Sequence, residues 1–173
     1  MDFNTLVKTR LFPILQKYGF EIKEEFQNIL HFQSSIIEIK IILNSLEKSC
    51  YLFMGKKGEL LHELRNNAVK ELFNSSLSVE RVTSETLVQN LSILFETKEG
   101  VEILKGNIDA FINFKISEDE NYTSELIRKQ LLDVASKAWK NNDNITFAKS
   151  IEKVGINNVP QSYKLKYKIA KRM

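Results

Sequence analysis

The sequence contains few of the residues that interrupt secondary structure or carry redox chemistry. Its 173 residues include two prolines, six glycines and one cysteine. With 43% hydrophobic and 27% charged residues, this composition is typical of one globular domain, or of one domain with a small appendage. The lone cysteine, Cys50, excludes an internal disulfide and agrees with a reducing compartment. We expect it to pack as a small hydrophobic residue, with a thiol pKa slightly lowered by the nearby Lys48.

Long apolar stretches are also missing. No apolar run approaches the roughly 18 residues that a membrane-spanning helix requires. The first twenty residues lack the basic start, unbroken apolar segment and small-residue cleavage site of a signal peptide. We therefore predict a cytoplasmic protein with no membrane partner.

Motifs for catalysis, metals and cofactors are missing as well. The two histidines, His31 in an expected strand and His62 in an expected helix, have no second His or Cys at ligand spacing. The segment "MGKKGEL" (54–60) lacks the glycine spacing and the Lys-Ser/Thr pair of a phosphate-binding loop. We expect no catalytic residue, no metal site and no cofactor. An enzyme built on dispersed carboxylates stays open as an alternative, and it would require a pocket in which two acids converge.

The first half of the chain predicts a helix followed by strands. Apolar residues recur at helical spacing over 3–18, where Pro13 either kinks the helix or starts a second one, and Gly19 ends it. In the segment 37–43, apolar residues at every second position alternate with Glu38, Lys40 and Ile42, which is typical of a half-buried strand. The runs "FEIKEE", "FQNILHFQS", "IIEIKIILN" and "CYLFMGK" have short connections. They predict a four-stranded antiparallel meander.

The second half predicts helices. Helical stripes occur over 61–72 and 87–95, the latter with Ser84 as N-cap, and over 101–114 with a break at Gly106. The acidic run "SEDEN" (117–121) interrupts the pattern and predicts a boundary between an α+β domain, 1–116, and a helical segment, 121–173, unless the two pack as one unit. In the segment 121–173 we expect three helices. The second is capped by Asn144 and ended by Gly155, and the third follows Pro160.

The segment 129–162 resembles a single tetratricopeptide repeat. Ser136, Trp139, Ala148 and Pro160 follow one another at intervals of three, nine and twelve residues. The resemblance implies a hairpin of two packed helices. Leu132 and Glu152 depart from the motif, and no second copy is found upstream, so the stacked groove of a repeat array is not expected. The alternative is an ordinary helical hairpin whose Trp139 fills the core.

Residues 1–115 resemble small immunity proteins of bacterial toxin systems. The resemblance is carried by the opening helix into "LQKYGFEIKEEFQNILHFQSS", by the Ile-rich strands, and by "LFETKEGVEILKGNIDAF" in the helical part. It implies a non-catalytic protein that binds and blocks one toxin domain, and it transfers no site residue. Residues 1–120 carry 14 Lys/Arg and 18 Asp/Glu. That acidic balance would suit a basic nuclease toxin.

Two groups of charged residues are candidate partner-binding sites. Glu118, Asp119 and Glu120 are adjacent, and they either attract a cation or basic partner or form a solvated loop. In the last helix, lysines share one face and tyrosines lie beside them, a pattern that can hold phosphates and stack on bases: Tyr163, Lys164, Tyr167, Lys168 and Lys171. This favours nucleic-acid binding as the alternative function. The competing interpretation is a terminal helix that buries Leu165 and Ile169.

Overall fold

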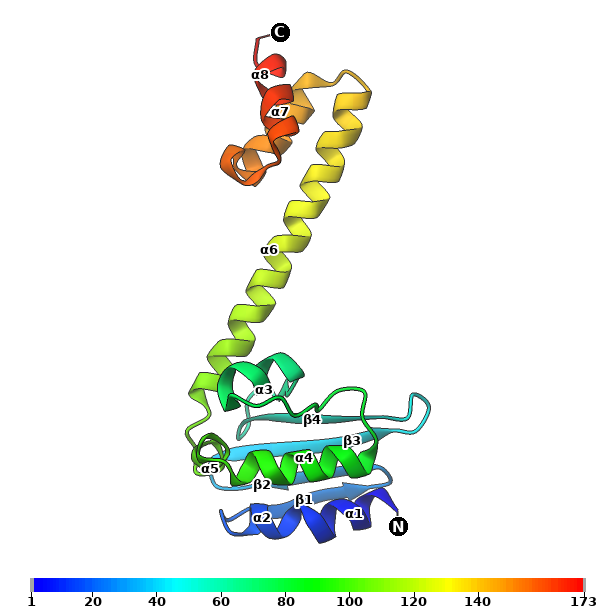
Figure 1. Cartoon of the computed structure of the whole chain (residues 1–173), viewed down its shortest axis with the longest axis vertical. Helices are drawn as coiled ribbons and strands as arrows, with labels where there is room; N and C mark the ends of the chain where they lie inside the picture. The colour runs from blue at the N-terminus through cyan, green and yellow to red at the C-terminus, as the bar shows by residue number, and fades with distance from the viewer. Residues whose placement is uncertain (1, 173) are drawn as a thin grey trace. The chain divides into compact units, whose positions relative to one another are not determined.

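The computed structural model describes residues 2–172 and contains two compact units, one extending to Ile116 and one beginning at Ser117. The first unit combines a sheet with helices, and the second contains helices (Figure 1). The chain is therefore an α+β protein, as the sequence predicts.

Two short helices open the first unit, α1 (Phe3–Arg10) and α2 (Phe12–Gln16). The carboxylate of Asp2 caps α1 by accepting a hydrogen bond from the backbone N–H of Thr5 at 3.0 Å. Pro13 lies in the first turn of α2, where a missing N–H costs nothing, so it starts a second helix. Gly19 follows with φ of +77°, a left-handed conformation that ends the helical run as predicted.

A five-stranded antiparallel meander follows, in the order β1-β2-β3-β4-β5. The strands are β1 (Glu21–Phe26), β2 (Ile29–Gln33), β3 (Ile37–Asn44), β4 (Ser49–Lys56) and β5 (His62–Glu63). The predicted meander is confirmed, with one strand more than expected. The expected helix around His62 is wrong, because His62 and Glu63 pair with Met54 and Phe53 of β4. The helix α3 starts only at Asn66 and ends at Phe73.

One face of the sheet packs against helices and forms the core. The helices α1, α2 and α4 (Ser84–Glu96) cover this face, with α5 (Lys98–Leu104) at one end (Figure 1). The sheet contributes alternate residues that are almost completely buried, among them Phe32, Ile39, Ile41 and Leu52. Packing on one face is what the alternation in β3 requires. The N-cap of α4 is Thr83, whose hydroxyl accepts from Thr86 N–H, and not the predicted Ser84.

After a break at Gly106, α6 (Asp109–Lys140) continues without interruption through the acidic run. The predicted loop at Glu118–Glu120 is therefore wrong. No glycine or proline occurs between 107 and 154, so nothing in the backbone ends the helix there. Polar residues alone interrupt the apolar pattern without interrupting the helix.

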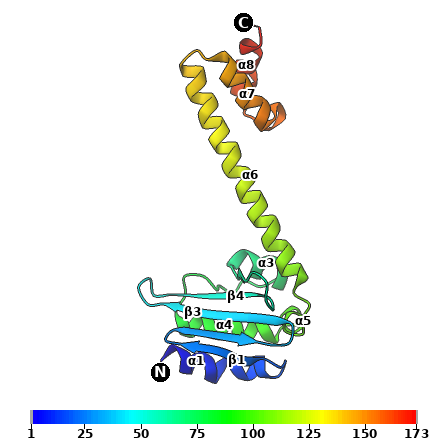
Figure 2. The same ribbon diagram turned by 180° about the vertical axis from the view of Figure 1, so that it is seen from behind.

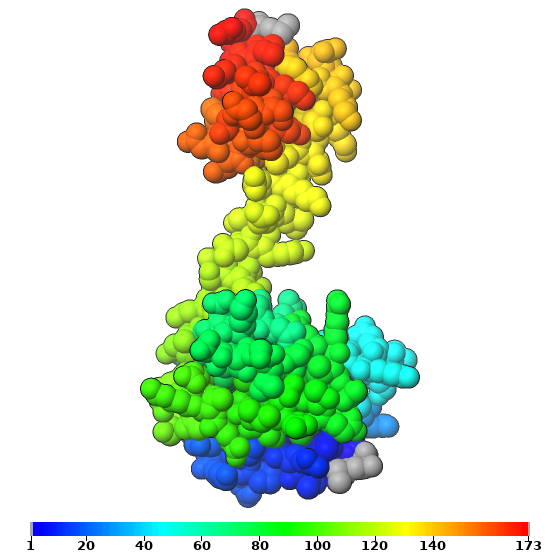
Figure 3. Space-filling view, viewed as in Figure 1, coloured from blue at the N-terminus to red at the C-terminus, as the bar shows by residue number. Residues whose placement is uncertain are grey.

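In the second unit, the end of α6 packs with α7 (Asn144–Val154), a short 3-10 turn (Ile156–Asn158) and α8 (Gln161–Ala170). The helices α7 and α8 lie side by side, orange and red in Figure 3. Five residues form the small core: Ala135, Ala138, Phe147, Ile151 and Val159. The Trp139 ring packs beside Phe147 with the centroids 5.1 Å apart, so Trp139 helps to fill the core. Asp143, not Asn144, caps α7, and Gly155 ends it as predicted.

Candidate functional site

The face of the sheet opposite the core helices, the outer face, is the candidate site. In Figure 2 the strands lie in front of α4, and within the described residues of the first unit no helix covers this face. Because side chains alternate along a strand, the residues between the buried ones point to the outer face. Three cross-strand rows result from the register of the strands.

The first of these rows is apolar and crosses four strands. Phe26 pairs with Ile29, Ile29 with Ile42, and Ile42 with Tyr51. We call these four residues the apolar row. Phe26 is 60% exposed and the other three are half-buried. A solvated sheet face normally carries polar residues, so a continuous apolar row marks a surface suited to contact with another molecule.

The second row is charged and lies next to the apolar row. It runs through Glu24, His31, Lys40, Phe53 and Glu63, which are paired in register across all five strands. His31 lies between two carboxylates, with Nε2 3.1 Å from Glu38 Oε2 and Nδ1 3.5 Å from Glu24 Oε2. Both ring nitrogens of His31 therefore face acidic oxygens.

The third row runs through Glu21, Gln33, Glu38 and Gly55, and its Glu38 is the centre of this network. Its second oxygen accepts a hydrogen bond from Lys23 Nζ at 3.1 Å, and only 7% of the residue is exposed. Burial raises the pKa of Glu38, but the hydrogen bond and charge of Lys23, together with His31, outweigh burial and hold this pKa below its usual value. Lys23 reaches Glu38 because the register of β1 shifts between Ile22 and Glu24, a β-bulge in an edge strand.

The turns at one end of the outer face are joined to each other. The side-chain amide of Asn28, in the β1–β2 turn, donates to Ser45 Oγ, in the β3–β4 turn, at 2.8 Å. Leu46, in the same β3–β4 turn, is 96% exposed. The apolar row thus lies between the turn that exposes Leu46 and the charged row. An apolar centre with a polar rim is the usual composition of a protein–protein interface.

The residues predicted as a partner-binding site on the last helix divide into two groups. Tyr163 stacks on Phe147, with ring centroids 6.2 Å apart. Tyr167 donates to Glu152 Oε1 at 2.7 Å, and Lys171 Nζ lies 2.7 Å from the same oxygen. These three side chains contact the second unit itself. Lys168 is exposed and Lys164 is half-exposed, so these two lysines remain at the surface.

The side of α8 that carries Leu165 and Ile169 is exposed. Leu165 is 55% exposed and Ile169 is 51% exposed, so the competing interpretation, in which the last helix buries this pair, is wrong. Tyr163 and Tyr167 on one side of α8, and Leu165 and Ile169 on the other, are each spaced one helical turn apart. The contacts with Phe147 and Glu152 place the tyrosine side inward.

The acidic residues Glu118, Asp119 and Glu120 lie in α6, in the second unit. Asp119 and Glu120 are exposed. Residues 1–116 carry 14 Lys/Arg and 15 Asp/Glu, which leaves them close to neutral. The acidic balance of residues 1–120 therefore comes mainly from α6 and does not describe the sheet-containing unit.

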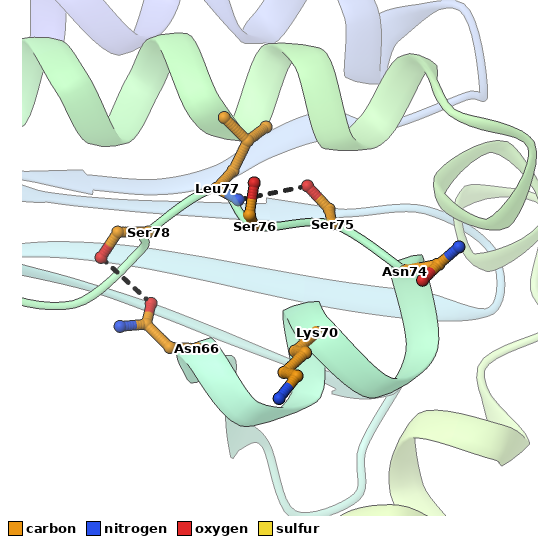
Figure 4. A pocket seen from close by; sticks show the side chains of 7 residues that line it. All are labelled: Asn66, Lys70, Asn74, Ser75, Ser76, Leu77 and Ser78. Atoms are coloured by element: carbon orange, nitrogen blue, oxygen red, sulfur yellow. Dashed lines mark hydrogen bonds between the residues drawn. The ribbon is translucent and has the colours of Figure 1, made fainter.

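A hollow of about 470 Å³ lies between α3 and the loop after it (Figure 4). It is lined by Asn66, Lys70, Asn74, Ser75, Ser76, Leu77 and Ser78. Asn66 Oδ1 accepts from Ser78 Oγ at 3.3 Å and from the backbone N–H of Val79 at 2.7 Å. Asn66 therefore holds the loop in place, and none of the described residues that line this hollow is an Asp or Glu.

A second hollow, of about 620 Å³, lies between α7 and the end of α8 and includes Asp143 and Glu152. Hydrogen bonds from Thr146 lower the pKa of Asp143, and Lys171 with Tyr167 lowers that of Glu152. A general acid needs a pKa raised toward neutrality. The pKa values of Asp143 and Glu152 are instead lowered, so neither carboxylate is suited to act as a general acid.

Cys50 and His62, the remaining residues considered for chemistry, are packed within the first unit. Cys50 is buried in β4, as predicted, but burial and the charge of Glu85 raise its thiol pKa to about 11, so the expected lowering by Lys48 is wrong. His62 packs edge-on against Phe111 with the ring centroids 6.4 Å apart. Across residues 2–172, no group of three or more His, Cys, Asp or Glu could hold a metal ion. Over the same residues, no helix is long and apolar enough to cross a membrane.

Comparisons with known proteins give no match: no family model, no curated protein and no solved structure matches this chain. The class defined by fold and site is an α+β protein with an uncovered apolar row on its sheet.

Proposed function

We propose that this chain is a non-catalytic protein-binding module and, in its sharpest form, an immunity-type inhibitor that covers one domain of a toxin. The observation that carries the proposal is the apolar row, which crosses four neighbouring strands on the outer face. A sheet face presents such a row at low entropic cost, because strand pairing already fixes its backbone.

The outer face contains both parts that a specific interface needs. Aromatic residues stand at the two ends of the apolar row, Phe26 and Tyr51, and aromatic side chains dominate the binding energy of most interfaces. The charged row beside them presents Glu24, whose side chain is 48% exposed, to a cationic group of the partner. Charges at the edge of an interface select the partner and speed association more than they add affinity.

Nucleic-acid binding through α8 is the alternative. It has less support, because Tyr163 and Tyr167 contact Phe147 and Glu152 and do not present their rings for stacking on bases.

The experiment is a capture of partners by the tagged full chain from cells of the source organism, followed by mass spectrometry. The test variant is Phe26→Thr with Ile29→Thr, since threonine keeps the preference for strand. We expect this variant to lose the captured protein, with Kd raised by at least about tenfold. Ile145→Thr, at a 70% exposed position of α7, is the matched control and should capture normally.

The inhibitor form is tested by expressing the captured protein alone and with this chain. Growth arrest that the chain relieves and the double variant does not relieve supports inhibition. A partner that binds the double variant as well as the unchanged chain would show that the outer face is not the site. Nucleic acid recovered in low salt without a stoichiometric protein would favour the alternative.

A further inference from the structure

The solvent side of α8 combines exposed aliphatic residues with cations. Leu165 and Ile169 lie one helical turn apart and are 55% and 51% exposed. The segment 161–172 contains five cations and no Asp or Glu: Lys164, Lys166, Lys168, Lys171 and Arg172. At 3.6 residues per turn, Lys166 falls on one flank of the aliphatic pair and the other cations fall on the opposite flank.

This orientation of α8 is held by contacts on its other side. Tyr163 stacks on Phe147 at an interplanar angle of 15°, and the hydroxyl of Tyr167 donates to Glu152. Turning Leu165 and Ile169 inward would break both contacts. The aliphatic pair is therefore fixed at the surface of the second unit and does not pack into the core of that unit.

The cations of α8 differ in what they contact. Lys166 lies over the rings of Trp139 and Tyr163, at 5.4 and 5.6 Å from the centroids, and Lys171 pairs with Glu152. Lys164, Lys168 and Arg172 make none of these contacts. They lie within one to three residues of the aliphatic pair, and Lys168 and Arg172 are exposed whereas Lys164 is half-exposed.

We propose that α8 binds the surface of an anionic lipid bilayer, with Leu165 and Ile169 entering the boundary between headgroups and acyl chains. Helices with this combination lie in the plane of the interface, and each Lys or Arg near an anionic leaflet adds to the attraction. Flexible lysine stems can reach the headgroups while the aliphatic pair inserts. This peripheral contact needs no spanning helix, and it is an alternative to the expectation of no membrane partner.

The same side of α8 is poorly suited to nucleic acid. Affinity for single strands combines phosphate contacts with stacking of bases on aromatic rings. Here the two tyrosines face the core, and the residues that accompany the cations are aliphatic. An aliphatic pair gains free energy in a lipid interface but not along a phosphate backbone.

The test is vesicle flotation of the full chain with phosphatidylcholine alone and with about 30% phosphatidylserine, in low and moderate salt. We expect binding to the anionic vesicles, weaker binding in moderate salt, and little binding to the neutral ones. Leu165→Ser with Ile169→Ser should lower the affinity about tenfold, because each residue still has half of its surface to bury. Lys164→Glu with Lys168→Glu should abolish binding.

Matched controls separate this surface from general stickiness. Leu126→Ser with Ile145→Ser removes two other exposed aliphatic residues, and Lys129→Glu with Lys137→Glu removes two other exposed cations. Both should leave flotation unchanged, and circular dichroism should show that every variant is folded. Absence of binding to anionic vesicles overturns the proposal, as does binding that the Leu165/Ile169 variant retains in full. Binding of single-stranded RNA by a chain that ignores vesicles also overturns it.

Discussion

Glu38 shows how a charged residue becomes almost inaccessible on an otherwise open sheet face. Its two carboxylate oxygens contact Lys23 and His31 separately, so an amide in its place would lose the negative charge and keep an acceptor for only one of the two. We expect Glu38→Gln to lower the free energy of unfolding by about 1–3 kcal/mol at neutral pH, measured by urea denaturation. Glu24→Gln is the control and should cost less than about 1 kcal/mol, because the Glu24 side chain is 48% exposed.

The contribution of Glu38 should also depend on pH. Its pKa in the folded chain is below the usual 4.5, so folding favours the ionised form. The stabilisation is therefore complete above the unfolded pKa and is lost as the pH falls through the lower, folded pKa. The difference between the unchanged chain and Glu38→Gln should shrink in that window below pH 4.5. A difference that stays constant down to strongly acidic pH would contradict this account.

Part of the network around Glu38 could be predicted from the sequence. Alternation along β3 places Glu38 and Lys40 opposite Ile37, Ile39 and Ile41, so their outward direction is predictable. Their partners are not, because the contact of Lys23 with Glu38 depends on a bulge in β1 that has no signal of its own. The apolar row did have a signal: "CYLFM" in β4 is apolar on both faces, which a half-solvated strand does not need.

At the scale of elements, the junction of α4 and α5 depends on one small residue. Thr97 ends α4 and caps α5, with its hydroxyl donating to Leu94 O at 2.6 Å and accepting from Gly100 N–H at 3.1 Å. A Cβ on Gly100 would overlap the Leu94 carbonyl and lie 2.7 Å from Phe95 Cα. Both neighbours are backbone atoms, so the two helices would have to separate.

We therefore expect Gly100→Ala to destabilise the first unit by about 1–3 kcal/mol, seen as a lower midpoint in thermal unfolding. Gly58→Asn is the control, because Gly58 has φ of +79° with nothing within 4 Å of an added Cβ, and asparagine tolerates this conformation. Its midpoint should change little. An unchanged midpoint for Gly100→Ala would mean that the junction is looser than its contacts indicate.

Helical periodicity predicts that a helix exists better than where it ends or which side it buries. Leu61 and Leu64, on either side of His62, continue the apolar spacing of α3. His62 nevertheless pairs with Met54 of β4, so this segment forms a strand and not a helix. In α8 both the tyrosine side and the Leu165/Ile169 side fit the helical repeat. Only the position of Phe147 and Glu152 in the folded unit selects the tyrosines, and no local pattern encodes that choice.

At the scale of the whole molecule, the two units differ in how much they bury. The core of the first unit extends from Phe3 to Phe111 and includes both helices and sheet, whereas five residues are fully packed in the core of the second. Small units with few buried apolar residues are marginally stable alone. Each unit also carries its own proposed surface, the apolar row in the first and the solvent side of α8 in the second.

We expect a chain that ends at residue 116 to stay soluble and unfold cooperatively, at nearly the midpoint of the sheet-containing unit in the full chain. It should keep the partner that depends on Phe26 and lose flotation with anionic vesicles. The isolated segment 117–173 should show partial helicity by circular dichroism, because a core of five buried residues gives its helices little packing to stabilise them. Aggregation of the shortened chain would mean that the first unit needs the second to fold, and the two surfaces would then have to be tested only in the full chain.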